Sequence, residues 1–105
     1  PGRPHGLLFS MRLDETTARV LLFLVDMNLQ NQGLGGQAWS EFAKRAMRDG
    51  VEAVQLEVRE DNSGGQRFYH RLGLEAIGHL ESYYGDGSEG LLMRGPLVGN
   101  PQQNY

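Results

Sequence analysis

The succession of a buried-strand pattern, a helix pattern and a second strand pattern most constrains the fold of this chain. Residues 18–25 (ARVLLFLV) form a continuous apolar run, as expected for a strand that is covered on both faces. From Leu34 to Ala46 apolar residues recur at four-residue steps, which is typical of an amphipathic helix. Residues 53–58 (AVQLEV) then alternate with a period of two, as in a strand. Because such a unit is a right-handed parallel crossover in nearly all folds, this stretch predicts two parallel strands joined by a helix.

The flanking segments add antiparallel pieces and a second helix. Asn62 is a suitable N-cap for that helix, and Gly50 and Gly73 suit the positions just after the two helix ends. In chain order, the remaining predicted elements are a strand over 7–13, a helix over 63–72, a strand over 75–84, a turn over 85–90 and a strand over 91–94. We therefore expect a mixed α/β sheet, α+β-like in its outer hairpins, with about five strands and two helices.

The length of 105 residues fits one compact domain. We expect this domain to cover residues 1–94 and the Gly- and Pro-containing segment 95–105 to be a disordered tail. The longest apolar run, Val20 to Val25, is far shorter than the roughly 20 residues that span a bilayer. With no apolar signal region near Pro1, we expect a cytoplasmic protein that has no membrane partner.

Charge and cysteine content exclude several classes of function. Ten basic residues against thirteen acidic residues give a net charge of −3, which argues against nucleic acid as a partner. The chain has no cysteine, so disulfides, cysteine zinc sites and a cysteine acyl-enzyme are impossible. Its three histidines, His5, His70 and His79, share no ligand spacing, and we predict no metal site from them.

A glycine-rich turn, Gln30 to Gly36 (QNQGLGG), separates the buried strand from the first helix. Glycines allow backbone N–H groups to approach a ligand closely, and a helix N-terminus carries roughly half a positive charge, so the turn predicts a phosphate cradle. Residues 33–38 also match the dinucleotide fingerprint G-x-G-x-x-A, although the polar segment 26–32 precedes the first glycine. A loop that only needs flexible residues is the third interpretation.

The same turn, as Gln30-x-x-Gly33-x-Gly35, resembles the Q/R-x-x-G-x-G/A motif of the GNAT superfamily of acetyl-CoA-dependent N-acetyltransferases. Further resemblances follow in family order: Leu24-Val25-Asp26, Leu56-Glu57-Val58-Arg59-x-x-Asn62, Phe68-Tyr69-x-x-Leu72-Gly73-Leu74 and Glu81-Ser82-Tyr83-Tyr84. The tyrosine pair is most similar to that of protein N-terminal acetyltransferases, including those that act on ribosomal proteins. Together these motifs extend over residues 7–94, which makes the resemblance specific.

The resemblance implies acetyl-CoA as the cofactor and assigns residues to its parts. The pyrophosphate would be held by the motif that Gln30 opens and by the backbone N–H groups of Asn31, Gln32, Gly33, Leu34, Gly35 and Gly36. The pantetheine arm would bond to Asn62 and to backbone groups of Leu24 and Val25, which would also reach the thioester oxygen. Because Asn31, Gln32 and Gly36 are not basic, phosphate binding would depend on backbone dipoles.

The resemblance also implies direct attack of a primary amine on the thioester. Glu57 would act as the general base through a water molecule; a solvated strand carboxylate is the alternative. Tyr69 would donate to the departing thiolate, although full transfer from a phenol of pKa about 10 to a thiol of pKa about 8.5 is uphill by roughly 2 kcal/mol. A core aromatic is the alternative for Tyr69. Trp39, Phe42 and Met47 are expected to belong to the core. Tyr83 and Tyr84 would line the acceptor entry, at most one of them if both lie on a strand.

A protein N-terminal α-amine is the acceptor that the resemblance favours. A lysine or a small amine is the second possibility, and a non-catalytic acyl-CoA-binding module is the alternative outside enzymes. The first strands and helices of the family fold have no counterpart in this sequence, so much of the family's acceptor site is expected to be missing. Strand 7–13 would then have an exposed edge, and we expect a homodimer through that edge, or aggregation.

Overall fold

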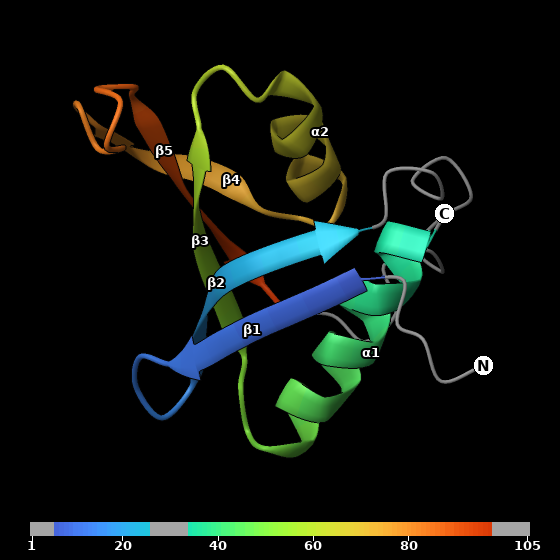
Figure 1. Cartoon of the computed structure of the whole chain (residues 1–105). Coiled ribbons are helices and arrows are strands. Elements are labelled where there is room, and N and C mark those ends of the chain that lie inside the picture. The colour runs from blue at the N-terminus through green and yellow to red at the C-terminus, as the bar shows by residue number, and fades with distance from the viewer. Residues whose placement is uncertain (1–5, 26–33, 98–105) are drawn as a thin grey trace.

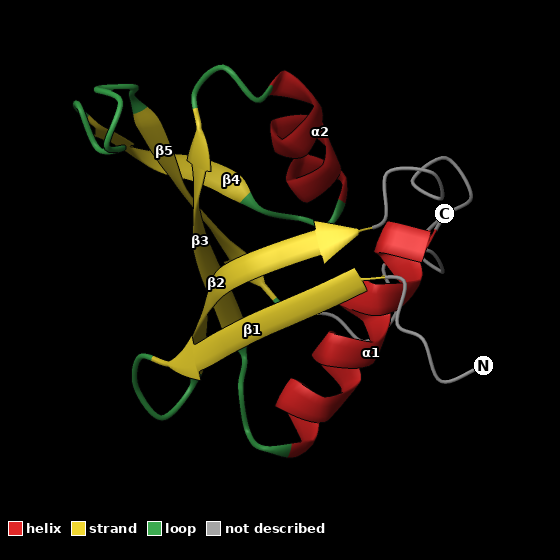
Figure 2. Cartoon of the chain, in the orientation of Figure 1, coloured by secondary structure: helices red, strands yellow, loops and turns green. Residues whose placement is uncertain are grey.

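The computed structural model describes residues 6–25 and 34–97. They form a five-stranded sheet with two helices, which confirms the predicted mixed α/β architecture (Figures 1 and 2). In chain order the elements are β1 (Gly6–Arg12), β2 (Thr17–Val25), α1 (Leu34–Arg48), β3 (Ala53–Arg59), α2 (Ser63–Arg71), β4 (Glu75–Leu80) and β5 (Gly90–Pro96). No helix within these ranges is long and apolar enough to cross a membrane.

The sheet has the strand order β1-β2-β3-β5-β4. As the sequence predicts, β2 and β3 are parallel and α1 connects them. The other neighbours, β1 with β2, β3 with β5 and β4 with β5, are antiparallel. β1 therefore lies at one edge of the sheet and β4 at the other, which agrees with the expected exposed edge of the first strand.

The burial pattern of β3 shows which face of the sheet the helices cover. Residues of β3 alternate between buried and half-buried along the whole strand: Leu56 is 2% exposed, whereas its neighbour Glu57 is half-buried on the opposite face. Both helices lie on one side of the sheet (Figure 1), and Trp39 of α1 and Leu72 at the end of α2 share one buried core cluster with Leu56. We call this the helix face, and we call the face of Glu57, which no described helix covers, the open face.

Aromatic rings connect the two helices across the helix face. The Trp39 ring lies 5.9 Å from the Phe23 ring of β2, 5.4 Å from Phe42 and 5.9 Å from the Tyr69 ring of α2, measured between ring centroids. Phe68 is 5.5 Å from Tyr69 and packs edge to face with it. Such pairs contribute about 0.5–1.5 kcal/mol each beyond their burial. Trp39 and Phe42 thus belong to the core as expected, whereas Met47 is 45% exposed and that expectation is wrong.

The helix ends follow the predicted signals. Gly50 and Gly73, just after α1 and α2, have positive φ angles of 88° and 101°, which glycine adopts without a Cβ clash. At the start of α2 the Asn62 side-chain oxygen accepts a hydrogen bond of 2.9 Å from the backbone N–H of Gly65, which confirms Asn62 as the N-cap.

The strand predicted over residues 75–84 is wrong in its second half. β4 ends at Leu80, which pairs with Gly90, the first residue of β5. Residues 81–89 form a turn, because Arg59 of β3 fastens this segment through hydrogen bonds of 2.8 Å to Asp86 and 2.6 Å to Ser88. The aromatic pair at 83 and 84 has high strand propensity, but these tertiary contacts determine its conformation.

The tail predicted over residues 95–105 is wrong in its first part, and the domain extends beyond residue 94. β5 continues to Pro96, which pairs with Ala53, and Leu97 is buried and donates its backbone N–H to the Glu52 carbonyl at 2.9 Å. Glycine and proline here do not break the strand, because Pro96 is its last residue and Gly95 lies against the backbone of Gly73. The rest of the predicted tail, 98–105, lies outside the described residues.

The close approach at Gly95 yields a test of this packing. A Cβ at residue 95 would overlap the Gly73 carbonyl oxygen, so the backbone must move. We expect Gly95→Ala to lower the free energy of unfolding by about 1–3 kcal/mol, measured by urea denaturation. Gly78→Ala is the matched control, since its Cβ would meet Leu92 at an ordinary 3.6 Å. Equal stability of the two variants would contradict the assigned contact.

Candidate functional site

The parallel strands β2 and β3 part before they end, and this divergence defines the candidate site. Their pairing extends only from Thr17 with Ala53 to Val20 with Leu56, although β2 continues to Val25 and β3 to Arg59. Figure 1 shows the two arrows diverging, with α1 and α2 following at their carboxyl ends. In open α/β sheets this end of the strands is where ligands bind.

The edge of β2 that faces β3 offers free backbone groups. Leu24 and Val25 pair with Leu7 and Gly6 of β1 on one side, and among the described residues no strand pairs with their other side. Exposed N–H and C=O groups along such an edge can bond an extended chain that carries amides. This placement suits the pantetheine contacts that the family resemblance implies for Leu24 and Val25, which stay a prediction.

The glycine-rich turn is described only in part. Leu34, Gly35 and Gly36 are the first residues of α1, and the first turn of that helix has no acidic side chain. The first N–H groups of a helix have no partner within it, so this end of α1 can attract an anion. Gln30, Asn31, Gln32 and Gly33 lie outside the described residues, and their predicted roles stay predictions.

Asn62 is already engaged in capping α2. A Cβ at Gly65 would lie only 2.5 Å from the Asn62 side-chain nitrogen, so the glycine makes room for the capping side chain. The Asn62 oxygen is used by the Gly65 N–H, which leaves the amide NH₂ as the group for a further partner. A pantetheine contact of Asn62 would therefore be a donation from its side chain.

Glu57 is held by Arg19, a partner that the sequence analysis missed. The Arg19 Nε lies 3.1 and 3.2 Å from the two carboxylate oxygens of Glu57, and its Nη2 lies 2.9 Å from Oε1. This charge-assisted fork orients the carboxylate on the open face, where it is half-buried. The hydrogen bond to Glu57 also raises the pKa of Arg19 above its ordinary value. The available signal was an arginine inside the apolar run 18–25.

Tyr83 and Tyr84 lie in the turn over 81–89 and not on a strand. The Arg19 Nη2 donates to the Tyr83 hydroxyl at 3.4 Å, a long bond that places Tyr83 beside the Arg19–Glu57 pair. The Tyr84 ring packs edge to face on Tyr83, with 5.1 Å between centroids, and the Arg59 guanidinium lies 5.1 Å from the Tyr84 ring centroid. Both tyrosines therefore contribute to one cluster with Glu57.

Arg59 fixes the turn electrostatically as well as geometrically. The hydrogen bond that Arg59 donates to Asp86 is the largest cause of a pKa for this carboxyl far below its usual range. Hydrogen bonds from Ser88 act in the same direction. Asp86 therefore stays ionised at neutral pH, and the contact to Arg59 persists. The turn that carries the two tyrosines is thus tied to β3.

Tyr69 lies on α2 among the rings of Trp39 and Phe68, on the helix face. Burial raises the pKa of its phenol above the ordinary value of 10.0, so the hydroxyl stays protonated at neutral pH. Within the described residues, no hydrogen bond involves this hydroxyl. The ring of Tyr69 packs on the core, and its donation to a departing thiolate stays a prediction.

Comparisons with known proteins agree on one family. The family model described as "Acetyltransferase (GNAT) family" matches residues 3–74. A curated N-alpha-acetyltransferase of Sulfurisphaera tokodaii is 38% identical over 64 residues, which cover 59% of this chain and 38% of that protein.

Solved structures show the same fold. Ard1 from Thermoplasma volcanium matches with a TM-score of 0.85 and 31% identity, over 89% of this chain and 63% of that chain. A GNAT family acetyltransferase from Elizabethkingia anophelis with acetyl-CoA bound matches with a TM-score of 0.82 and 17% identity, over 90% of this chain and 70% of that chain. The chain thus spans less than two thirds of the length of the Sulfurisphaera and Thermoplasma proteins.

The Arg19–Glu57 pair yields a second prediction. In a double-mutant cycle with Arg19→Met and Glu57→Gln, we expect a coupling of about 0.5–1 kcal/mol in the free energy of unfolding. The more exposed pair Arg59–Asp61, 3.3 Å apart, is the control and should show a smaller coupling. If the coupling energy of Arg19–Glu57 is no larger than that of Arg59–Asp61, solvent screens both ion pairs equally.

Proposed function

Because this chain belongs to the acetyltransferase (GNAT) family, we propose that it transfers an acetyl group from acetyl-CoA to a primary amine. The observation that carries the proposal is the divergence of β2 and β3 beyond Val20 and Leu56, with a free backbone edge and the start of α1 at that end. The Elizabethkingia structure with acetyl-CoA bound supports the donor. The name of the Sulfurisphaera relative supports a protein N-terminal α-amine as the acceptor.

The donor would be held mainly by backbone groups. The pyrophosphate would lie at the turn 30–36 and the first N–H groups of α1, where the helix dipole favours negative charge. The pantetheine arm would run along the free edge of β2 at Leu24 and Val25 and accept from the Asn62 amide. A donor N–H of that edge near the thioester oxygen would stabilise the negative charge that develops during attack.

Glu57 would take up the proton that the attacking amine loses. Three hydrogen bonds from Arg19 fill three of the roughly four acceptor positions of the carboxylate, which leaves room for one water molecule. Proton transfer through that water matches the role that the resemblance implies. Arg19 would thus be the residue that positions the base.

Tyr69 would donate a hydrogen bond to the sulfur as the C–S bond breaks. Its raised pKa keeps the donor proton in place, and it makes complete proton transfer to the thiolate still less favourable. The contribution of Tyr69 is therefore a hydrogen bond that strengthens as charge develops on sulfur. Tyr83 and Tyr84, on the open face, would line the entry of the acceptor peptide.

Tyr69→Phe tests the proposal. It preserves the packing on Trp39 and Phe68, so stability should be nearly unchanged. Single-turnover acetylation of an amine-bearing peptide should slow by about 10²–10⁴-fold. Affinity for acetyl-CoA, measured by calorimetry, should change by no more than roughly 1 kcal/mol.

If Tyr69→Phe reacts at the wild-type rate, Tyr69 is only a core aromatic. If the wild type binds acetyl-CoA but acetylates no N-terminal amine, lysine or small amine, the chain is instead a non-catalytic acyl-CoA-binding module. No binding at all would overturn the proposed function.

We also propose a homodimer through the free edge of β1. Among the described residues β1 is an edge strand, and Phe9 and Met11 are exposed on it, which favours pairing with a second copy. Light scattering at rising protein concentration should report a dimer, and Met11→Lys should shift it toward monomer because an edge charge opposes pairing. A monodisperse monomer at all concentrations would contradict the proposal.

A further inference from the structure

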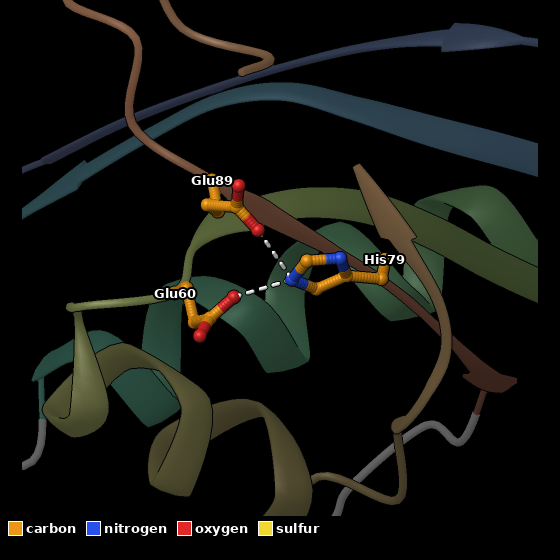
Figure 3. A group of neighbouring side chains, drawn as sticks. All are labelled: Glu60, His79 and Glu89. Atoms are coloured by element: carbon orange, nitrogen blue, oxygen red, sulfur yellow. Dashed lines mark hydrogen bonds and ion pairs between the residues drawn. The ribbon is translucent and has the colours of Figure 1, made fainter. Parts of the chain in front are cut away.

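Glu60, His79 and Glu89 converge at one end of the sheet (Figure 3). The Nε2 atom of His79 lies 2.6 Å from Oε2 of Glu60 and 2.8 Å from Oε1 of Glu89. One potential ligand atom from each residue lies within 4.8 Å of the other two. The three residues come from three separate parts of the chain: Glu60 directly follows β3, His79 is the next-to-last residue of β4, and Glu89 directly precedes β5.

The backbone ladder, and not chance contact of long side chains, brings these residues together. His79 pairs with Leu91, and Glu89 lies two residues before Leu91, hence on the same face of the sheet. The backbone N–H of Glu60 donates to the Glu89 carbonyl at 2.9 Å, which continues the pairing of Arg59 with Gly90. The three Cα positions are therefore fixed by strand pairing, and only the side-chain torsions remain to be set.

One proton on Nε2 of His79 cannot point straight at both carboxylates. An imidazole N–H points along one line, whereas both carboxylate oxygens lie at hydrogen-bond distance from this nitrogen. Two carboxylates at close range repel each other unless a cation lies between them. A cation bound by both carboxylates and by the imidazole nitrogen would remove that repulsion.

We propose that Glu60, His79 and Glu89 bind one divalent transition-metal ion, with zinc the ion that the donor set favours. An imidazole nitrogen with carboxylate oxygens is a donor set that zinc accepts, at about 2.0–2.2 Å from each ligand. Three protein ligands leave a position for water in a tetrahedral site. A hard cation such as calcium prefers oxygen ligands alone and is a worse match for His79.

All three side chains are partly exposed, so they can rotate to widen their separations by the roughly 1 Å that an ion between them requires. The bound ion would tie β3, β4 and β5 together at the base of the turn over 81–89. It would therefore raise the thermal stability of the chain, since a ligand that binds only the folded state stabilises it by mass action. This inference stands apart from the proposed acetyl transfer, because none of the three residues belongs to that site.

Calorimetric titration of the chain with zinc chloride tests the proposal directly. The wild type should bind one ion, and His79→Gln should weaken binding by at least about tenfold, since even outer-shell partners of a metal contribute that much. His5→Gln and His70→Gln are the matched controls, because they remove the other two histidines. Both should bind like the wild type, and calcium chloride should not compete.

Nitrogen NMR of the histidine side chains in the wild type covers the case in which a variant fails to fold. Zinc should move the Nε2 resonance of His79 and leave that of His70 in place, and the melting temperature should rise as zinc is added. If zinc shifts the nitrogen resonances of His5 or His70 to saturation while those of His79 do not move, the proposal is wrong. Equal affinity of the wild type and His79→Gln, or no binding of zinc by the wild type, would also overturn it.

Discussion

The alternation of buried and half-buried side chains along β3 is the constraint on which the rest of the structure depends. Val54, Leu56 and Val58 bury one face of the strand beneath both helices, so Glu57 and Arg59 must stand on the open face. A shift of one residue in register would exchange the two sets and place two charges in the core. The antiparallel ladder with β5, from Ala53–Pro96 to Arg59–Gly90, prevents this shift along the whole strand.

The position of the helices follows from the same topology. α1 and α2 each connect strands that run in the same direction across the sheet, and both pack on the helix face. The Trp39 ring lies between β2 and α2, and its contacts with Phe23 and Tyr69 hold these elements together where β2 and β3 part. The divergence is thus filled on one side by aromatic rings, and the backbone edge of β2 remains for a ligand.

The sequence could predict what depends on local pattern. The sheet class, the ends of both helices and the Asn62 cap follow from periodicity and from short-range signals around single residues. It could not predict the Arg19–Glu57 pair, because that contact depends on the register between two strands that the sequence does not state. The same holds for Glu60, His79 and Glu89, which share no spacing and meet only through the ladder.

Two errors in the predicted elements have related causes. The aromatic residues at 83 and 84 led to a predicted strand that continued to Tyr84, and Gly95 led to a predicted strand end at residue 94. In both places a tertiary contact overrides the local preference. Arg59 fastens the turn near the tyrosines, whereas Gly95 is required because any side chain would strike the Gly73 carbonyl. Propensity describes an average environment, and these positions are decided by a single neighbour.

Residues from both faces of the sheet contact the turn over 81–89. On the open face Arg59 holds Asp86 and the Tyr84 ring, and on the helix face Glu89 meets His79 beside Glu60. A connection of this length has considerable conformational freedom unless contacts remove it. Because it is fastened on both faces, Tyr83 stays beside Arg19 and Glu57, and the geometry of the candidate site depends on charged groups outside it.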